Sequence, residues 1–308
     1  FKVVDYLEDS RATYPAEYID NWLGKLDPKD LSLETWQGRD HRGKPMEHAS
    51  DREKWYSKKT KALYYLNKFQ ECVEIGKEAL EEISVFHYRN DKWMKRWIAL
   101  SYGELNKAEE GIPWLDQILD HSAEWFLNYD MANLLHKLGD LDEALKYSSL
   151  AALDRQNLGY KCNVFLLMGR ILLKKGEHDL AKKHLLLAAT IRVEKEWSIP
   201  SELQELLDQN GIKISESETA NELAKGLRNY WQSMRYAEMD ATTGIVKNIV
   251  RSGKSGFISG VDGKEYYFKV SDFQGNPKLL KTGTRVAFFI QKSDQLDKLD
   301  TALGVKLD

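Results

Sequence analysis

The chain has 308 residues, of which 42% are hydrophobic and 30% are charged, with a formal net charge of −3. This length is typical of two domains, and the apolar fraction suffices for hydrophobic cores, which excludes wholesale disorder. Only 6 prolines are present, and because proline interrupts helices, we expect a mainly α-helical protein with a smaller second part.

Several classes of protein are excluded by particular residues. No apolar run approaches the ~20 residues of a membrane helix, and with the charged residues Lys2, Asp5 and Glu8 near the start of the sequence we expect no signal peptide. Cys72 and Cys162 are too few for a disulfide framework or a zinc site. We therefore expect a cytoplasmic protein without a membrane, metal or cofactor. The chain begins with Phe rather than Met, which leaves open whether the natural protein extends further in that direction.

Residues 1–51 are predicted to form a helix over residues 10–26 and then a polar, turn-rich loop over residues 27–51. The loop contains Asp40, His41, Glu47 and His48, and a hydrolytic or metal site there is the most remote of the alternatives. No phosphate-binding glycine loop, HExxH or nucleophile elbow is present, so we expect no enzymatic activity and no catalytic residue.

A repeated pattern occupies residues 52–195. The segment Gly139-Asp-Leu-Asp-Glu-Ala-Leu145 recurs as Gly176-Glu-His-Asp-Leu-Ala-Lys182, and looser copies begin at Asn67 and Asn106. The Gly or Asn that begins each copy is suited to the left-handed turn between two helices. Because one helical hairpin cannot bury its apolar face alone, we expect the hairpins to stack.

Small residues follow each turn at a fixed offset, where two antiparallel helices would approach most closely. These positions are Cys72, Gly111, Ala144 and Ala181, and a second set lies seven residues later at Ala79, Ile118, Ala151 and Ala188. The pattern resembles the tetratricopeptide repeat family, whose repeat has about 34 residues. The resemblance implies a domain over residues 52–210, made of four repeats and a capping helix near residues 200–209.

In that family the first helix of each repeat lines a concave groove, and the resemblance places a mixed set of side chains there. They are Lys54, Ser57, Lys58, Lys61, Trp93, Arg96, Leu100, Phe126, Tyr129, Asn133, His136, Asn163 and Arg170. Those expected to bind a partner are Lys58, Lys61, Arg96, Tyr129, Asn133 and Arg170. Cations, amides and aromatics on one wall suit an acidic peptide or a phosphate backbone. The alternative is a solvated face with a few core aromatics.

The connecting segment, residues 211–241, is expected to contain a helix over residues 216–239 with Arg228 and Trp231. It is rich in neither Gly nor Pro, so we expect it to dock the second domain and not to act as a free linker.

The pattern changes to period two in the last domain, residues 242–308. Four β-rich runs cover residues 244–250, 256–259, 265–270 and 285–291, and a fifth covers residues 303–307. Five short strands predict a small barrel of the OB type. Residues 242–292 hold nine basic and three acidic side chains, a net charge of +6 in an otherwise acidic chain. A polyanion is therefore the expected partner of this domain.

Five segments of this domain resemble bacterial cold-shock domains in the same order. Three are Gly244-Ile-Val-Lys-Asn-Ile249, Lys254-Ser-Gly-Phe-Ile258 and Glu265-Tyr-Tyr-Phe-Lys-Val-Ser-Asp-Phe273; the others are Leu280-Lys-Thr-Gly-Thr-Arg-Val-Ala-Phe288 and Ala302-Leu-Gly-Val305. The chain departs from the family at Asn248, Ser255 and Lys269, which replace a Trp, the first Phe of the ribonucleoprotein motif and a His. Charge should therefore carry more of the affinity than in the family.

Strand alternation assigns the two faces of the barrel. Inward residues are expected to be Val246, Ile258, Tyr266, Phe268, Val286 and Phe288. The outward residues Phe257, Tyr267 and Lys269, with Lys247 and Lys254 beside them, occupy the positions with which the family stacks single-stranded bases.

The resemblances together imply a non-enzymatic adaptor that binds single-stranded nucleic acid, RNA sooner than DNA, and a protein partner or a second copy of the chain. The alternative is a pure protein-interaction scaffold whose barrel no longer binds nucleic acid. On architecture alone, such a fusion is similar to accessory proteins of bacterial defence systems.

Overall fold

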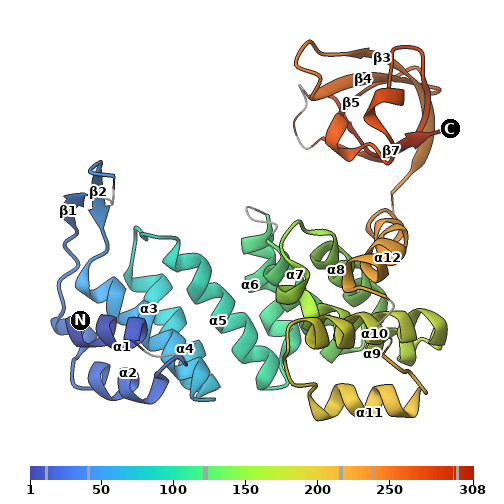
Figure 1. Ribbon diagram of the computed structural model, residues 1–308. Helices are drawn as coiled ribbons and strands as arrows, with labels where there is room; N and C mark the ends of the chain where they lie inside the picture. Colours follow the sequence, from blue (N-terminus) through green and yellow to red (C-terminus); the bar gives the residue numbers. More distant parts are fainter. Residues whose placement is uncertain are drawn as a thin grey trace. The chain divides into compact units, whose positions relative to one another are not determined.

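The computed structural model describes residues 1–308 except 11–12, 40–41, 121–123, 215–217, 238, 294 and 296–297. The described residues form twelve α-helices followed by a closed five-stranded barrel (Figure 1). The predicted fold class, mainly α with a small all-β domain, is therefore confirmed. The chain divides into two compact units, Phe1–Gly226 and Leu227–Asp308. None of the helices in the described ranges combines the length and hydropathy needed to cross a bilayer.

The N-terminal segment differs from the single helix and loop predicted for it. Helices α1 (Lys2–Ser10) and α2 (Ala16–Leu23) replace the helix over residues 10–26. Pro15 precedes α2, and proline disfavours helical backbone in the residue before it, which prevents one continuous helix. The expected loop contains a 3₁₀ turn (Pro28–Asp30) and an antiparallel hairpin of β1 (Trp36–Arg39) and β2 (Pro45–His48).

Four helical hairpins follow, as the repeat pattern predicts. They pair α3 (Asp51–Tyr65) with α4 (Phe69–Glu82), α5 (Asn90–Glu104) with α6 (Ala108–Leu119), α7 (Trp125–Leu138) with α8 (Leu141–Leu153), and α9 (Cys162–Lys174) with α10 (His178–Glu194). A 3₁₀ turn (Leu158–Lys161) precedes α9, and α11 (Ser201–Gln209) lies where a capping helix is expected.

The turn residues have the backbone conformation that their identities predict. The φ angles of Asn67, Asn106, Gly139 and Gly176 are 60°, 58°, 83° and 79°, all in the left-handed region. The small residues that follow lie at close helix contacts: Cys72, Ala144 and Ala181 are fully buried. A Cβ on Gly111 would lie 2.7 Å from the carbonyl oxygen of Ala99, so only glycine fits there.

Helix α12 (Ala220–Arg235) is shorter than the expected helix over residues 216–239. The Thr219 hydroxyl accepts a hydrogen bond from the backbone N–H of Glu222, whose carboxylate accepts one from the N–H of Thr219. This reciprocal capping box fixes the helix start.

The barrel is formed by β3 (Ala241–Ile249), β4 (Ser255–Gly260), β5 (Glu265–Lys269), β6 (Arg285–Gln291) and β7 (Thr301–Leu307). Its strand order is β3-β4-β5-β7-β6 with β6 pairing back to β3; β5 and β7 are parallel and the other pairs antiparallel. Such a closed mixed barrel is compatible with an OB-type fold. All six residues predicted to point inward are at most 1% exposed and belong to one core cluster.

Candidate functional site

Two aromatic side chains form the centre of the outward barrel surface. Phe257 on β4 and Tyr267 on β5 are cross-strand partners. Their ring centroids are 5.9 Å apart at an interplanar angle of 67°, and both rings are half-buried. We call this pair the barrel platform. Aromatic rings that keep an accessible face on a sheet can stack against the bases of a single strand.

A shallow cleft adjoins the barrel platform on each of two sides. One, of about 440 Å³, is lined by Lys254 of the β3–β4 turn together with Tyr267 and Lys269. The other, of about 680 Å³, is lined by both platform residues, Lys269 and described residues of the β6–β7 connection, among them Lys292 and Lys298. Tyr267 and Lys269 line both clefts, whereas Phe257 lines the larger of the two.

Four lysines line these clefts, and two of them escaped the sequence analysis. Lys254 and Lys269 were predicted, whereas Lys292 and Lys298 come from the β6–β7 connection. None of the four forms an ion pair with a carboxylate among the residues that the structure describes. These two lysines lie between the fourth and fifth predicted strands and were a visible signal, but alternation along strands does not indicate where a loop folds. Asp294 and Asp297 of this connection lie outside the described residues.

Lys247 differs from the other predicted cations of the barrel. It lies at a β-bulge between Val246 and Asn248, where the register of β3 against β4 shifts by one residue. Its ammonium group pairs with the carboxylate of Glu265 at 2.7 Å. The charge of Lys247 is therefore offset locally by a carboxylate on the outward surface, a pairing that was not predicted from sequence.

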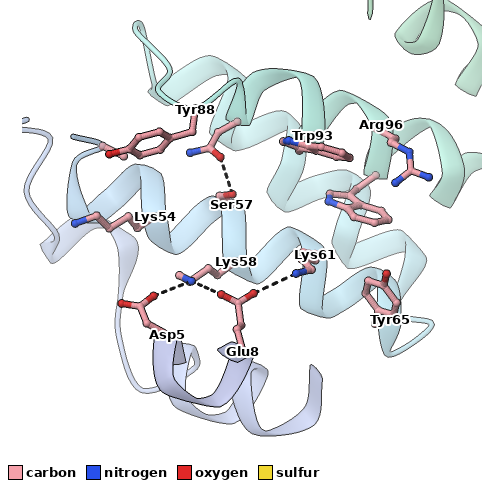
Figure 2. A pocket seen from close by; sticks show the side chains of 13 residues that line it. Asp5, Glu8, Lys54, Ser57, Lys58, Lys61, Tyr65, Tyr88, Trp93 and Arg96 are labelled. Carbon is pink, nitrogen blue, oxygen red and sulfur yellow. Dashed lines mark hydrogen bonds and ion pairs between the residues drawn. The ribbon is translucent and has the colours of Figure 1, made fainter. Parts of the chain in front are cut away.

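A second candidate site lies in the helical unit. A cavity of about 580 Å³ is lined by six of the residues predicted for the groove: Lys54, Ser57, Lys58, Lys61, Trp93 and Arg96 (Figure 2). We call it the helical cavity. Residues that were not predicted complete its lining, namely Asp5 and Glu8 of α1 with Ala49, Tyr65, Tyr88, Asn90 and Trp97.

The other predicted groove residues do not line this cavity. Asn133 donates its side-chain N–H to the carbonyl oxygen of Tyr129 at 2.9 Å, and Arg170 forms an ion pair with Glu202 at 3.2 Å. Burial raises the pKa of the Tyr129 hydroxyl. The six residues expected to bind a partner are thus divided, with Lys58, Lys61 and Arg96 in the cavity and the other three outside it.

Carboxylates of the same unit neutralise the cations of the helical cavity. Lys58 pairs with Glu8 and, at 2.9 Å, with Asp5, while Lys61 pairs with Glu8 at 3.2 Å. Burial opposes the charged form of Lys58, but its hydrogen bonds to Glu8 and Asp5 outweigh burial and raise its pKa. Arg96 contacts both carboxylate oxygens of Asp130, at 2.5 and 3.3 Å.

The hydrolytic or metal site considered for the loop over residues 27–51 lies only partly within the described residues. Asp40 and His41 lie outside the described residues. The Nδ1 atom of His48 lies 2.5 Å from the hydroxyl of Tyr88, and Glu47 lies 3.5 Å from His87. Within the described ranges, no cluster of three or more His, Cys, Asp or Glu side chains is arranged to hold a metal ion.

No protein-family model matches this chain, and no curated protein matches it significantly.

Proposed function

We propose that the chain is a non-enzymatic adaptor that binds single-stranded nucleic acid on its barrel and a protein partner in its helical cavity. In this proposal the barrel is a cold-shock-like OB domain and the helical hairpins are tetratricopeptide-like repeats. RNA is the preferred nucleic acid, as the resemblance to cold-shock domains implies.

The proposal rests on the combination of aromatic rings and neighbouring lysines at the barrel platform. Phe257 and Tyr267 offer ring faces to bases, and Lys254 and Lys269 are available to phosphates beside them. Stacking on aromatic rings tolerates every base and contributes ~1–3 kcal/mol per base. Lysine contacts add affinity that falls with salt because counterions are released.

The alternative, a scaffold that binds only proteins, is favoured by a different observation. In the Lys247–Glu265 pair, a lysine predicted to contact phosphates is already bound to a carboxylate. The pair also places a negatively charged group on the outward surface. A carboxylate there repels phosphates but is compatible with a protein partner.

A titration decides between these functions. Labelled oligo-U, oligo-dT and a duplex of the same length are titrated with the full chain at two salt concentrations. The adaptor should bind both single strands, oligo-U more tightly, with an affinity that falls steeply as salt increases, and should bind the duplex weakly. If no single strand binds at low salt, the scaffold function is correct.

A further inference from the structure

Helix α1 presents two acidic side chains to the lysines of the helical cavity (Figure 2). Asp5 and Glu8 lie three residues apart, as do Lys58 and Lys61 on α3. Residues at this spacing share one face of a helix. Lys58 bonds to both carboxylates and Lys61 to Glu8, so the two helices are joined by a ladder of opposite charges.

Little else holds α1 in place. It has 9 residues, a length at which an isolated helix is marginal in water. Among its described side chains, Val4 is the one that is buried, in a core cluster that Phe1 also contacts. Val3 and Tyr6 are 46% and 69% exposed. The ion pairs with Lys58 and Lys61 are therefore a large part of what holds α1 in place.

The helical cavity remains open beside α1. Its volume of about 580 Å³ lies next to the charge ladder, between Tyr65 and Trp93 (Figure 2). Tyr65 is 51% exposed and its ring packs against that of Trp97, so this aromatic wall of the cavity is accessible from solvent. The cavity can therefore accept an aromatic or branched apolar side chain that α1 does not supply.

We propose that the helical cavity binds an acidic amphipathic helix of a partner protein, and that α1 is its intramolecular competitor. This inference rests on the proposed partner-binding function of the cavity. The ligand presents two carboxylates one helical turn apart to Lys58 and Lys61, and a bulky apolar side chain beside them to the open space. The ligand binds more tightly than α1 because it also fills this space. Its carboxylates replace those of Asp5 and Glu8 as acceptors of the charge-assisted hydrogen bonds from Lys58 and Lys61.

The test uses a labelled, end-blocked peptide of residues 1–10 as the acidic probe and fluorescence anisotropy with the full chain. In the variant Asp5→Asn/Glu8→Gln, the chain's own α1 loses its two bonded carboxylates and vacates the site more often. Apparent affinity scales with the fraction of vacant sites, so we expect the probe to bind this variant about tenfold more tightly than the wild type.

Two controls make the result specific. Asp9 is exposed, carries the same charge and forms no ion pair among the described residues, so Asp9→Asn should leave the affinity of the probe unchanged. Adding Lys58→Gln and Lys61→Gln to the double variant should abolish binding. A thermal melt of every variant separates loss of binding from loss of fold.

Several outcomes would overturn the inference. Equal affinity of the wild type and the double variant would mean that α1 does not compete, and binding that survives the lysine substitutions would place the acidic helix elsewhere. If the double variant instead dimerises with concentration, a second copy is the occupant. Oligonucleotide titration of the same variants tests the barrel separately, so failure here can be distinguished from failure of the nucleic-acid proposal.

Discussion

The lysines of the helical cavity and those of the barrel clefts are arranged in opposite ways. Lys58 and Lys61 pair with carboxylates of α1, whereas Lys254 and Lys269 have no carboxylate partner among the described residues. A cation that is already paired contributes to binding only if the ligand replaces its partner. An unpaired lysine attracts any phosphate, and salt weakens this attraction. The difference favours a selective protein ligand in the cavity and a sequence-tolerant polyanion on the barrel.

The largest expected effect separates the two faces of the barrel. Phe268 is fully buried, so Phe268→Ala should lower the free energy of unfolding by ~3–5 kcal/mol. Phe257→Ala and Tyr267→Ala should be milder for the fold but should each weaken single-strand binding by ~1–3 kcal/mol. Urea unfolding and oligo-U titration measure the two quantities.

Duplex binding is the control for these three variants. Paired bases cannot stack on the platform, so both outward substitutions should leave duplex affinity nearly unchanged. If Phe257→Ala and Tyr267→Ala destabilise the barrel as much as Phe268→Ala while binding survives, the platform does not contact bases.

The next largest effect tests the packing between helices in the repeats of the helical unit. Gly111→Ala would place a methyl group 2.7 Å from the carbonyl oxygen of Ala99, and Ala144→Leu would enlarge a fully buried side chain. Each should cost ~1–3 kcal/mol of unfolding free energy by overpacking. Gly226→Ala is the matched control, because its Cβ would meet no atom within 4 Å and alanine favours a helix. Unchanged melting temperatures for both Gly111→Ala and Ala144→Leu would refute the close packing at these positions.

Local rules made the repeats and the barrel core predictable. A left-handed turn favours Gly or Asn through local sterics alone, which is why Asn67 and Gly139 could be placed from sequence. The inward residues of the barrel follow from a period of two, which is clearest along β4 and β5. The platform residues Phe257 and Tyr267 are the other half of that alternation.

The rest depends on contacts between distant residues. The β1–β2 hairpin has polar strands of 4 residues without apolar alternation, so the sequence carries no strand signal there. The ion pair of Lys58 with Glu8 joins residues 50 positions apart, and no local pattern indicates it. The bulge at Lys247 breaks the alternation from which the outward lysines were assigned, which is why its pairing with Glu265 was missed.

A pH effect should distinguish the two units. All seven histidines precede residue 185, so the barrel has none. Burial lowers the pKa of His184 to about 4, below the ~6.5 of an unfolded chain. The unfolded state then binds the proton first, and stability present above pH ~6.5 is lost as the pH falls towards 4.

Urea unfolding measures this loss in the helical unit. Acidification from about pH 7 to about pH 5 should lower the free energy of unfolding by about 1–2 kcal/mol through His184. The variant His184→Gln should lack this part of the pH dependence. His178→Gln on the same helix is the matched control, since His178 is exposed. A pH dependence unaffected by His184→Gln would mean that this histidine is not held neutral by the fold.

The smallest expected effect compares two lysines within the barrel. Lys254→Gln removes a cation beside Tyr267 that pairs with none of the described carboxylates, so it should weaken oligo-U binding and reduce the slope of log affinity against log salt by ~0.7. Lys247→Gln should change both quantities less, because Glu265 already offsets that charge at 2.7 Å. Glu265→Gln frees Lys247 and removes a negative charge from the outward surface, so it should tighten binding and steepen the slope by about the same ~0.7. If Lys247→Gln and Lys254→Gln weaken binding equally, the ligand breaks the Lys247–Glu265 pair, and pairing in the free protein does not predict which cations a polyanion uses.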